Sequence, residues 1–201
     1  MSNGIKVNKR NGRGVEPLDL EKIHKMVEEA TKGLAGVSAS QVEIQSGIQF
    51  YDGITTEEIQ EILIKSASDL IDLDHPNYQF VAARLLLFAL RKSLYGKMRD
   101  LPHLEDHIYK CVNQEVYDAG LYDKYSKEEI DKANGYIDHG RDFLFTYAGL
   151  RQVVDKYLVQ DRSTNEVYET PQFMYMMIAL TIFAEYPKQT RLNYVRRYYD
   201  A

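Results

Sequence analysis

The apolar segment FVAARLLLFAL, residues 80–90, places the strongest constraint on how this chain can fold. A helix built from it carries apolar side chains on nearly every face, and such a helix is buried in the interior of a domain. Pro76 fits the first turn of this helix, and Gly96 fits the position just after its end near Tyr95. We therefore expect one long helix at the centre of a helical bundle.

Three more helices are expected before this central helix, because capping residues mark each start. They cover residues 20–32 between the cap Asp19 and Gly33, a stretch from a capping box of Ser40 and Glu43 to about Phe50, and a stretch behind a second box of Thr55 and Glu58. The pair Asp52-Gly53 is expected to turn the chain between the last two. Four helices with short connections predict one compact module over residues 20–95.

The second half of the chain begins after a connector at residues 97–102 and is also expected to be mainly helical. The expected helices lie near residues 104–117, behind a capping box of Ser126 and Glu129, near residues 141–156, from Thr170-Pro171 onward, and near residues 188–200. The segment YLVQDRSTNEVYET alternates and turns like a β-hairpin with Ser163-Thr164-Asn165 at its tip.

The closing residues RRYYDA contain no Gly, Pro or polar tail that would end the last helix. We therefore expect the 201 residues to be a piece of a longer protein. Truncation, proteolysis and a split gene are all open as the origin of such a piece.

A cationic turn, VNKRNGRGVEP, precedes the first helix. Asn11-Gly12 is the pair that a two-residue hairpin loop prefers, because both central positions need a positive φ. This loop places Arg10 opposite Arg13, and like charges that face each other destabilise a β ladder. An anion held between these cations and the N-terminus of the helix that Asp19 caps would relieve the repulsion. The alternative is a solvated hairpin whose charges prevent edge-to-edge aggregation.

The overall composition excludes several classes of protein. A net charge of −5 argues against broad binding of nucleic acid. No apolar run is long enough to span a bilayer, and the N-terminus lacks the apolar core of a secretory signal, so we expect a cytoplasmic protein without membrane contact. The single cysteine, Cys111, excludes an internal disulfide and a cysteine-based zinc site, and its helical face favours a buried, inert role.

Other residues that could carry chemistry have structural interpretations. His103 and His107 are four residues apart, as two metal ligands on one helix are, but no third ligand accompanies them, so we expect no metal site. His139 is expected to join a structural cluster of hydrogen bonds and ion pairs. We expect Phe143, Phe145 and Tyr147 in the core, and Lys188, Arg191, Arg196 and Arg197 facing solvent or parts of a longer protein.

Several blocks of the sequence resemble a known family. VNKRNG, LDLEKI, GITTEEI and PNYQFVAARLLLFALRK resemble the ATP-cone, the regulatory nucleotide-binding module of ribonucleotide reductase large subunits. IDHGRDFLFTYAGLRQVVDKYLVQD, VYETPQFMYMMIA and RRYYDA resemble the helical region that precedes the catalytic barrel in the class I, aerobic enzyme. The resemblance implies a mainly α fold. A four-helix cone with a small β-hairpin or sheet as its lid spans residues 1–96, and a helical region with one β-hairpin spans residues 97–201.

The resemblance also implies a site for ATP or dATP, with or without Mg²⁺, between the lid and the helices. Lys9, Arg10 and Lys92 would contact phosphates, Val7 and Ile23 would line the base pocket, and Glu16 would bond the adenine edge. The chain through Pro17, Leu18, Asp19, Leu20 and Glu21 would wrap the nucleoside, Lys22 would reach the ribose-phosphate side, and Thr56 would supply a hydroxyl.

Gln60 occupies a position where His is common in cones that respond to dATP. A Gln side chain keeps a hydrogen bond but carries no proton or positive charge. The resemblance therefore implies a site that binds nucleotide and discriminates poorly between ATP and dATP.

The function implied is that of the N-terminal regulatory part of a ribonucleoside-diphosphate reductase large subunit, with ATP as activator and dATP as inhibitor. The partners implied are the remainder of the large subunit, a radical-generating small subunit and further copies in a homo-oligomer. The family's chemistry needs three cysteines in the barrel, and Cys111 matches none of them, so we expect these 201 residues to be inactive alone, with no catalytic and no metal-binding residue. A stand-alone sensor of adenine nucleotides and a degenerate, purely structural cone are the alternatives.

Overall fold

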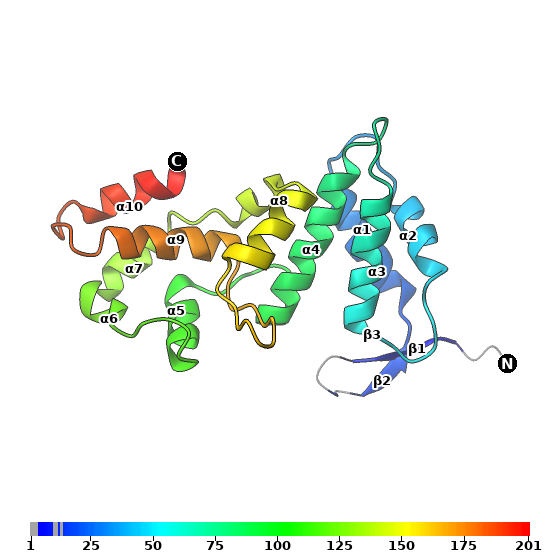
Figure 1. The fold of residues 1–201 in the computed structure, drawn as a ribbon, viewed down its shortest axis with the longest axis horizontal. Coiled ribbons are helices and arrows are strands. Elements are labelled where there is room, and N and C mark those ends of the chain that lie inside the picture. Colours follow the sequence, from blue (N-terminus) through cyan, green and yellow to red (C-terminus); the bar gives the residue numbers. More distant parts are fainter. Residues whose placement is uncertain (1–3, 10–11, 13) are drawn as a thin grey trace. The chain divides into compact units, whose positions relative to one another are not determined.

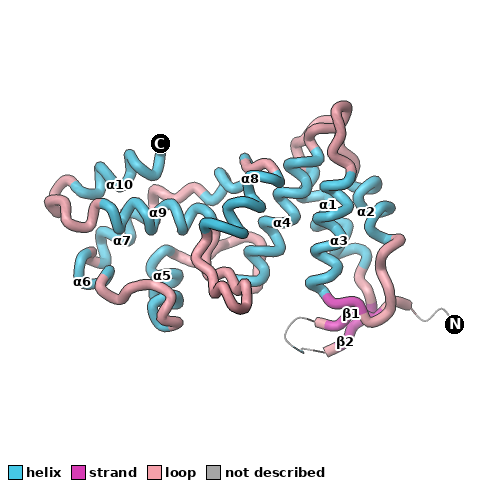
Figure 2. The backbone as a smooth tube through the Cα atoms, in the orientation of Figure 1, coloured by secondary structure: helices cyan, strands magenta, loops and turns pink. Residues whose placement is uncertain are grey.

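The computed structural model describes residues 4–9, 12 and 14–201. The chain divides into two compact units, the first made of residues 1–90 and 143–151 and the second of residues 91–142 and 152–201. Helices dominate both units, and in the described part of the chain all strands belong to the first (Figure 1, Figure 2). The prediction of a mainly α fold with a small sheet near the N-terminus is therefore confirmed.

The first unit contains the helical module that the sequence predicts. Its elements are β1 Lys6–Asn8, β2 Val15–Pro17, α1 Leu20–Thr31, α2 Ala39–Gly47, β3 Ile54–Thr55, α3 Thr56–Asp69 and α4 Tyr78–Tyr95, the last of which runs on into the second unit. Side chains along the middle of α4, including Val81, Ala82 and Leu87, are fully buried. The central position expected for this helix is confirmed.

The arginine inside the apolar segment of α4 has a structural task. The Arg84 guanidinium donates to the carbonyl oxygens of Ala30, at 3.1 Å, and Lys32, at 2.7 Å. These carbonyls lie at the C-terminal end of α1, where backbone acceptors lack helical partners. Arg84 therefore closes the end of α1 and fixes α4 against it.

The three strands form one small sheet in the order β2-β1-β3. β1 pairs antiparallel with β2, from Lys6 opposite Pro17 to Asn8 opposite Val15, and this is the register that a two-residue loop at Asn11-Gly12 requires. The expected facing pair of Arg10 and Arg13 lies outside the described residues.

The third strand, which the sequence did not predict, ties the hairpin to α3. β1 pairs parallel with β3, Val7 opposite Ile54 and Asn8 opposite Thr55. The Lys6 amide donates to Asp52 Oδ1 at 2.8 Å, and the Gly53 amide donates to the Lys6 carbonyl at 2.9 Å. Gly53 has φ +86°, a conformation that glycine adopts without strain, and so the predicted Asp52-Gly53 turn is confirmed.

Most capping predictions hold, and one is wrong. Asp19 caps α1, and Thr55 with Glu58 forms the expected capping box of α3. The expected box of Ser40 and Glu43 does not form, because the chain is extended at Ser38 and this residue caps α2 by accepting from the Gln41 amide. α2 therefore begins earlier and ends at Gly47, before the expected Phe50. Pro76 precedes α4 by two residues instead of lying in its first turn.

The second half of the chain is built from short helices. They are α5 Leu104–Asn113, α6 Leu121–Lys124, α7 Lys127–Asn134, the 3-10 helix η2 His139–Leu144, α8 Tyr147–Gln152, the π-helix η3 Val153–Tyr157, α9 Pro171–Ile182 and α10 Arg191–Asp200. The second unit buries its own apolar cluster, which includes Leu104, Ile108, Phe173 and Met176. The capping box of Ser126 with Glu129 and the proline at the start of α9 are confirmed.

The single helix expected over residues 141–156 is wrong, because the chain breaks there into η2, α8 and η3. The Gly149 amide donates to Thr146 Oγ1 at 3.2 Å, so a new helix starts instead of continuing the old one. The helix expected to reach residue 117 ends at Asn113, since Glu115 has a positive φ of 56°. The expected hairpin is present as a tight turn with one bridge, Gln160 opposite Val167.

Arg191 was expected to face solvent or a further part of the protein, and this is wrong. Its side chain is buried, and its Nε and Nη2 atoms contact the Glu129 carboxylate at 2.7 and 2.5 Å. The guanidinium also donates to the carbonyls of Ala184 and Lys124 and lies over the Tyr125 ring. Lys188, Arg196 and Arg197 are exposed.

The buried polar groups of the second unit form two connected systems. In one, Arg91 donates to Asp142 at 2.8 Å, Gln172 donates to the same carboxylate at 2.9 Å, and the Tyr199 hydroxyl donates to Gln172 at 2.6 Å. His139 joins it through its carbonyl oxygen, which accepts from Arg91, so its structural role is confirmed. In the other system, the buried ring of His107 stacks on Phe173 and bonds the hydroxyl of Tyr117.

The thiol of Cys111 is fully buried beside the His107 ring, which confirms its expected burial. Burial raises the pKa of this thiol to about 11, and so it is protonated at neutral pH.

Removal of the buried Arg191 guanidinium by Arg191→Ala should strongly destabilise the second unit, because Glu129 then keeps its charge without a partner. We expect a loss of about 3–5 kcal/mol in the free energy of unfolding, measured by urea titration. The exposed pair of Lys65 and Asp69 is the control, and Lys65→Ala should cost less than about 1 kcal/mol. Equal effects of the two substitutions would contradict this account.

Stability should fall as the solution is acidified, because burial lowers the pKa of His107 to about 3 and of His139 to about 4. A histidine in the unfolded chain has a pKa of about 6.5. Below that pH the unfolded chain therefore binds protons that the folded chain does not bind, and this favours unfolding. His107→Leu should therefore lose about 1–2 kcal/mol less than the parent chain between pH 7 and pH 5. Parallel curves of unfolding free energy against pH for the two proteins would contradict the prediction.

Candidate functional site

The register of the hairpin decides which side chains face the helices. Residues directly opposite in an antiparallel pair lie on one face, and alternate residues along a strand share a face. Val7 is 4% exposed and packs in the core of the first unit. Glu16, its partner, and Lys9, two residues further on, therefore lie on this inner face, whereas Lys6 and Asn8 are on the outer face.

Lys9 and Glu16 form an ion pair on this inner face. Lys9 Nζ lies 2.6 Å from Glu16 Oε2, and the two side chains are 40% and 35% exposed. The Lys9 amide donates to the Gly14 carbonyl at 2.9 Å, which carries the ladder one residue beyond β1. A cation and an acceptor are thus held next to each other where the hairpin covers the helices.

The N-terminus of α3 lies next to Lys9. Asn8 is opposite Thr55, so Lys9 and Thr56 are the residues that follow the last paired positions of β1 and β3. The positive end of a helix dipole favours an anion, and Thr56 adds a hydroxyl, which donates to Glu57 at 2.9 Å. The amide of Glu58 in the same turn is occupied by the capping box with Thr55. Gln60 follows one turn later on the same side of α3 and is 8% exposed.

The predicted site also includes residues at the start of α1. Asp19 Oδ1 accepts from the Lys22 amide at 3.1 Å, and this bond, with the Lys22 ammonium, lowers the pKa of Asp19. Ile23, one turn into α1, is buried. Leu20, Glu21 and Lys22 expose their side chains, as Pro17 does, and Leu18 is partly buried.

The structure therefore brings together only some of the residues that the sequence assigned to one site. Val7, Lys9 and Glu16 share the inner face of the sheet, and Thr56 follows the strand beside them. Arg10 lies outside the described residues. Lys92 lies in the last turn of α4, in the second unit, and so it is not placed with this group.

Sequence reasoning identified Asp52-Gly53 only as a turn and did not consider Asn8, so it missed that these three residues hold the sheet in position. The Asn8 side chain donates to the Gly53 carbonyl at 2.7 Å, and the Asp52 carboxylate accepts from the backbone of β1. The Asp-Gly pair directly before Ile54-Thr55 was the available signal, because this pair turns a chain into a strand.

A second group of donors lies in the second unit, where one ligand atom each of His103, Glu105 and Asp131 falls within 4.8 Å of the others. His103 Nδ1 accepts from the Glu105 amide, and Glu105 pairs with Lys127 at 3.2 Å. These groups are occupied as a helix cap and a surface ion pair, and we assign no ion to them. His107, the other member of the expected histidine pair, points into the core instead.

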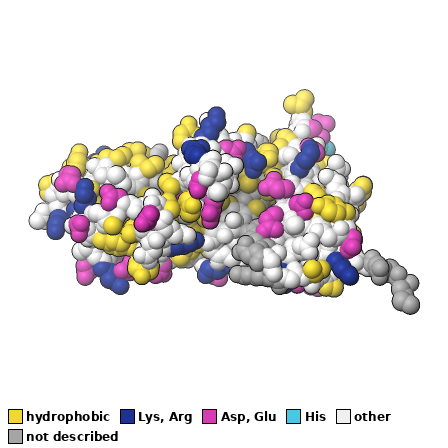
Figure 3. Space-filling view, turned by 60° about the horizontal axis from the view of Figure 1, so that its bottom comes forward, with side chains coloured by type: hydrophobic (Ala, Val, Ile, Leu, Met, Phe, Trp, Pro, Cys, Tyr) yellow, Lys and Arg dark blue, Asp and Glu magenta, His cyan; other side chains and the backbone are white. Residues whose placement is uncertain are grey.

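On the face of the molecule seen in Figure 3, Lys and Arg side chains and Asp and Glu side chains are scattered among apolar and other residues. Among the described residues, no helix combines the length and the apolar character that crossing a membrane demands.

Two families match separate parts of the chain. Residues 5–93, which hold the sheet and α1 to α4, match the ATP cone domain. Residues 143–201 match the ribonucleotide reductase all-alpha domain. The hairpin, the capped helices and the lysine on the inner face all fall within the first match.

The whole chain also aligns with curated relatives. It is 50% identical over 201 residues to the ribonucleoside-diphosphate reductase subunit alpha of Haemophilus influenzae and 48% identical to the ribonucleoside-diphosphate reductase 1 subunit alpha of Escherichia coli. It is 43% identical over 188 residues to the subunit alpha of Enterobacteria phage T4. The alignments cover 100%, 100% and 92% of this chain, but only 26%, 26% and 24% of the relatives. The chain thus belongs to the family of the ribonucleoside-diphosphate reductase alpha subunits, of which it carries the ATP cone domain and the all-alpha domain.

Proposed function

We propose that the cone binds ATP and dATP, with or without Mg²⁺, between the hairpin and the helices, and that this binding regulates a ribonucleotide reductase. The observation that carries the proposal is the position of Lys9 and Glu16 on the inner face of the hairpin, beside the start of α3. A lid that served only to cover the helices has no need of two charged side chains on that face, where each is partly withdrawn from water, at 40% and 35% exposed.

The chemistry of these groups suits a nucleotide. The Lys9 ammonium and the α3 amides attract polyphosphate, while the Glu16 carboxylate accepts from an exocyclic amine such as that of adenine. Because Lys9 and Glu16 now bond each other, a nucleotide replaces one ion pair by two charge-assisted interactions, one at each end. The remaining roles follow the resemblance. Val7 and Ile23 line the base pocket, Pro17 to Glu21 wrap the nucleoside, Arg10 reaches the phosphates, and Lys22 reaches the ribose-phosphate side.

The resemblance further supports a division of labour within a complete alpha subunit. Residues 1–96 act as the regulatory cone, and residues 97–201 connect it to a catalytic barrel that lies elsewhere. ATP activates and dATP inhibits the reduction of ribonucleotides by changing how alpha subunits assemble with one another and with a radical-generating small subunit in the cytoplasm. The buried, protonated thiol of Cys111 supports placing the thiol chemistry outside these residues.

A stand-alone sensor is the second candidate, and the alignments weigh against it. Identity of 43–50% extends past the cone through the all-alpha domain of the three alpha subunits. A module that only sensed nucleotides would have no use for that second region.

Loss of the inner-face cation should weaken nucleotide binding. Lys9→Ala is expected to lower the affinity for ATP by about tenfold or more, since a hydrogen bond to a charged group contributes about 1.5–3 kcal/mol. Isothermal titration calorimetry on the 201-residue chain measures this affinity. Lys6→Ala removes a cation from the outer face of the same strand and should leave the affinity unchanged. Equal affinities of the Lys9 and Lys6 variants would refute the assigned site.

Gln60 should make this cone a poor discriminator between ATP and dATP, because its amide carries no positive charge. We expect the complete enzyme to show weaker inhibition by dATP than its histidine-bearing relatives, and Gln60→His to strengthen that inhibition. The measurement is a dATP titration of CDP reduction at fixed ATP. The prediction is wrong if dATP inhibits the parent enzyme fully at the concentrations that inhibit its histidine-bearing relatives.

A further inference from the structure

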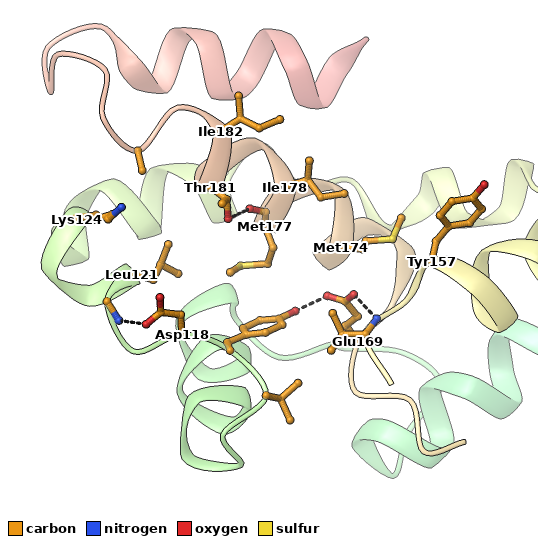
Figure 4. A pocket seen from close by; sticks show the side chains of 15 residues that line it. Asp118, Leu121, Lys124, Tyr157, Glu169, Met174, Met177, Ile178, Thr181 and Ile182 are labelled. Atoms are coloured by element: carbon orange, nitrogen blue, oxygen red, sulfur yellow. Dashed lines mark hydrogen bonds between the residues drawn. The ribbon is translucent and has the colours of Figure 1, made fainter. Parts of the chain in front are cut away.

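A cavity of about 450 Å³, partly open to solvent, is lined by residues of the second unit, none of which is assigned to the nucleotide. One side is α9, which contributes Met174, Met177 and Ile178, and the segment around Leu121 faces it (Figure 4). Its size and its largely apolar wall are those of pockets that bind small organic molecules, which measure about 300–1,000 Å³.

A buried carboxylate lies at one end of this cavity. Glu169 is 1% exposed, and in Figure 4 its carboxylate reaches the space below Met174. Glu169 Oε1 accepts from the Val159 amide at 2.8 Å, and Oε2 accepts from the Tyr117 hydroxyl. These two bonds use about two of the four lone-pair positions of a carboxylate, so acceptor capacity remains.

Both donors to Glu169 are neutral. The histidine behind Tyr117, His107, is neutral as well, because burial lowers its pKa to about 3. Within the described part of the chain no lysine or arginine pairs with Glu169, and burial raises the pKa of its carboxyl group. A buried carboxylate without a cation is costly, and an arriving cation would offset that cost.

The other charges that line the cavity add to this preference. Lys124, at the far end, is paired with Glu185 at 2.7 Å and so contributes little net positive charge. Asp118 lies at the same end, and its carboxylate accepts only from the Gly120 amide at 2.8 Å. The wall therefore presents an apolar surface with a negative balance of charge.

We propose that this cavity binds a small organic ammonium compound, whose apolar stem lies along Met174, Met177 and Leu121 and whose ammonium group donates to Glu169. An anion is disfavoured by Glu169 and Asp118. A purely apolar molecule fills the cavity but leaves the buried carboxylate unpaired. This site is independent of the nucleotide site, and the inference does not rest on the function proposed for the cone.

Three probes with one common stem test the proposal on the 201-residue chain. They are 4-phenylbutylamine, a cation at pH 7.5, 4-phenylbutan-1-ol, which is neutral, and 5-phenylpentanoate, an anion. Calorimetric titration should show that the amine binds about tenfold or more tightly than the alcohol, and that the carboxylate binds least, since the charged hydrogen bond supplies the difference. Equal binding of amine and alcohol, or no binding of the amine at millimolar concentration, overturns the proposal.

Two variants locate the binding. Glu169→Gln should reduce the affinity for the amine to that of the alcohol, whereas Glu166→Gln, on the same hairpin but outside the cavity wall, should leave the selectivity intact. Ile178→Lys keeps Glu169 and changes a side chain that is 39% exposed, so it is compatible with folding even where the first variant is not. Its tethered ammonium should compete with the amine and abolish its binding. Unchanged binding of the amine by Ile178→Lys also overturns the proposal.

Discussion

The pairing of β1 with β3 is the interaction on which the candidate site depends. A hairpin of two three-residue strands has little stability of its own, and here β3, the Asp52 carboxylate and the buried Val7 hold it against the helices. This attachment decides which face of the hairpin is covered, and therefore that Lys9 and Glu16 lie on the inner face while Lys6 lies on the outer one. It also places Lys9 near the start of α3, which is the positive end of the dipole of that helix.

Among the residues that the structure describes, the second unit buries some charged side chains as ion pairs and one, Glu169, without a partner of opposite charge. Arg91 with Asp142 and Arg191 with Glu129 are ion pairs that make further hydrogen bonds to neighbouring carbonyls or amides, so they fix the helices that carry them. Glu169 has the same burial but only neutral partners. The two ion pairs are explained by their structural role. The carboxylate of Glu169 has no cationic partner in the described part of the chain and borders a cavity, and this is why we propose a cationic ligand for it.

Local signals in the sequence were reliable where one residue acts on its own neighbourhood. Asp19, Thr55 with Glu58, Ser126 with Glu129 and the proline of α9 all mark helix starts, because a cap needs only backbone amides two or three residues away. The misplaced start of α2 shows the limit of such signals. A serine at position 38 or at position 40 could cap α2. Ser38 is the cap because the backbone is extended at this residue, as the position before a helix requires.

The sequence by itself determined the mainly α fold, the central helix α4, the cationic hairpin and the resemblance to the family. Each of these rests on periodicity, caps or motif order, which can be read from residues that are close together in the sequence. The tertiary structure alone decided the attachment of the hairpin through β3, the ion pair of Lys9 with Glu16, the burial of Arg191 and the cavity beside Glu169. Each of these joins residues that are distant in sequence or distinguishes two faces of one strand. Burial and pairing of that kind depend on which segments meet in space, and no local pattern of residues specifies it.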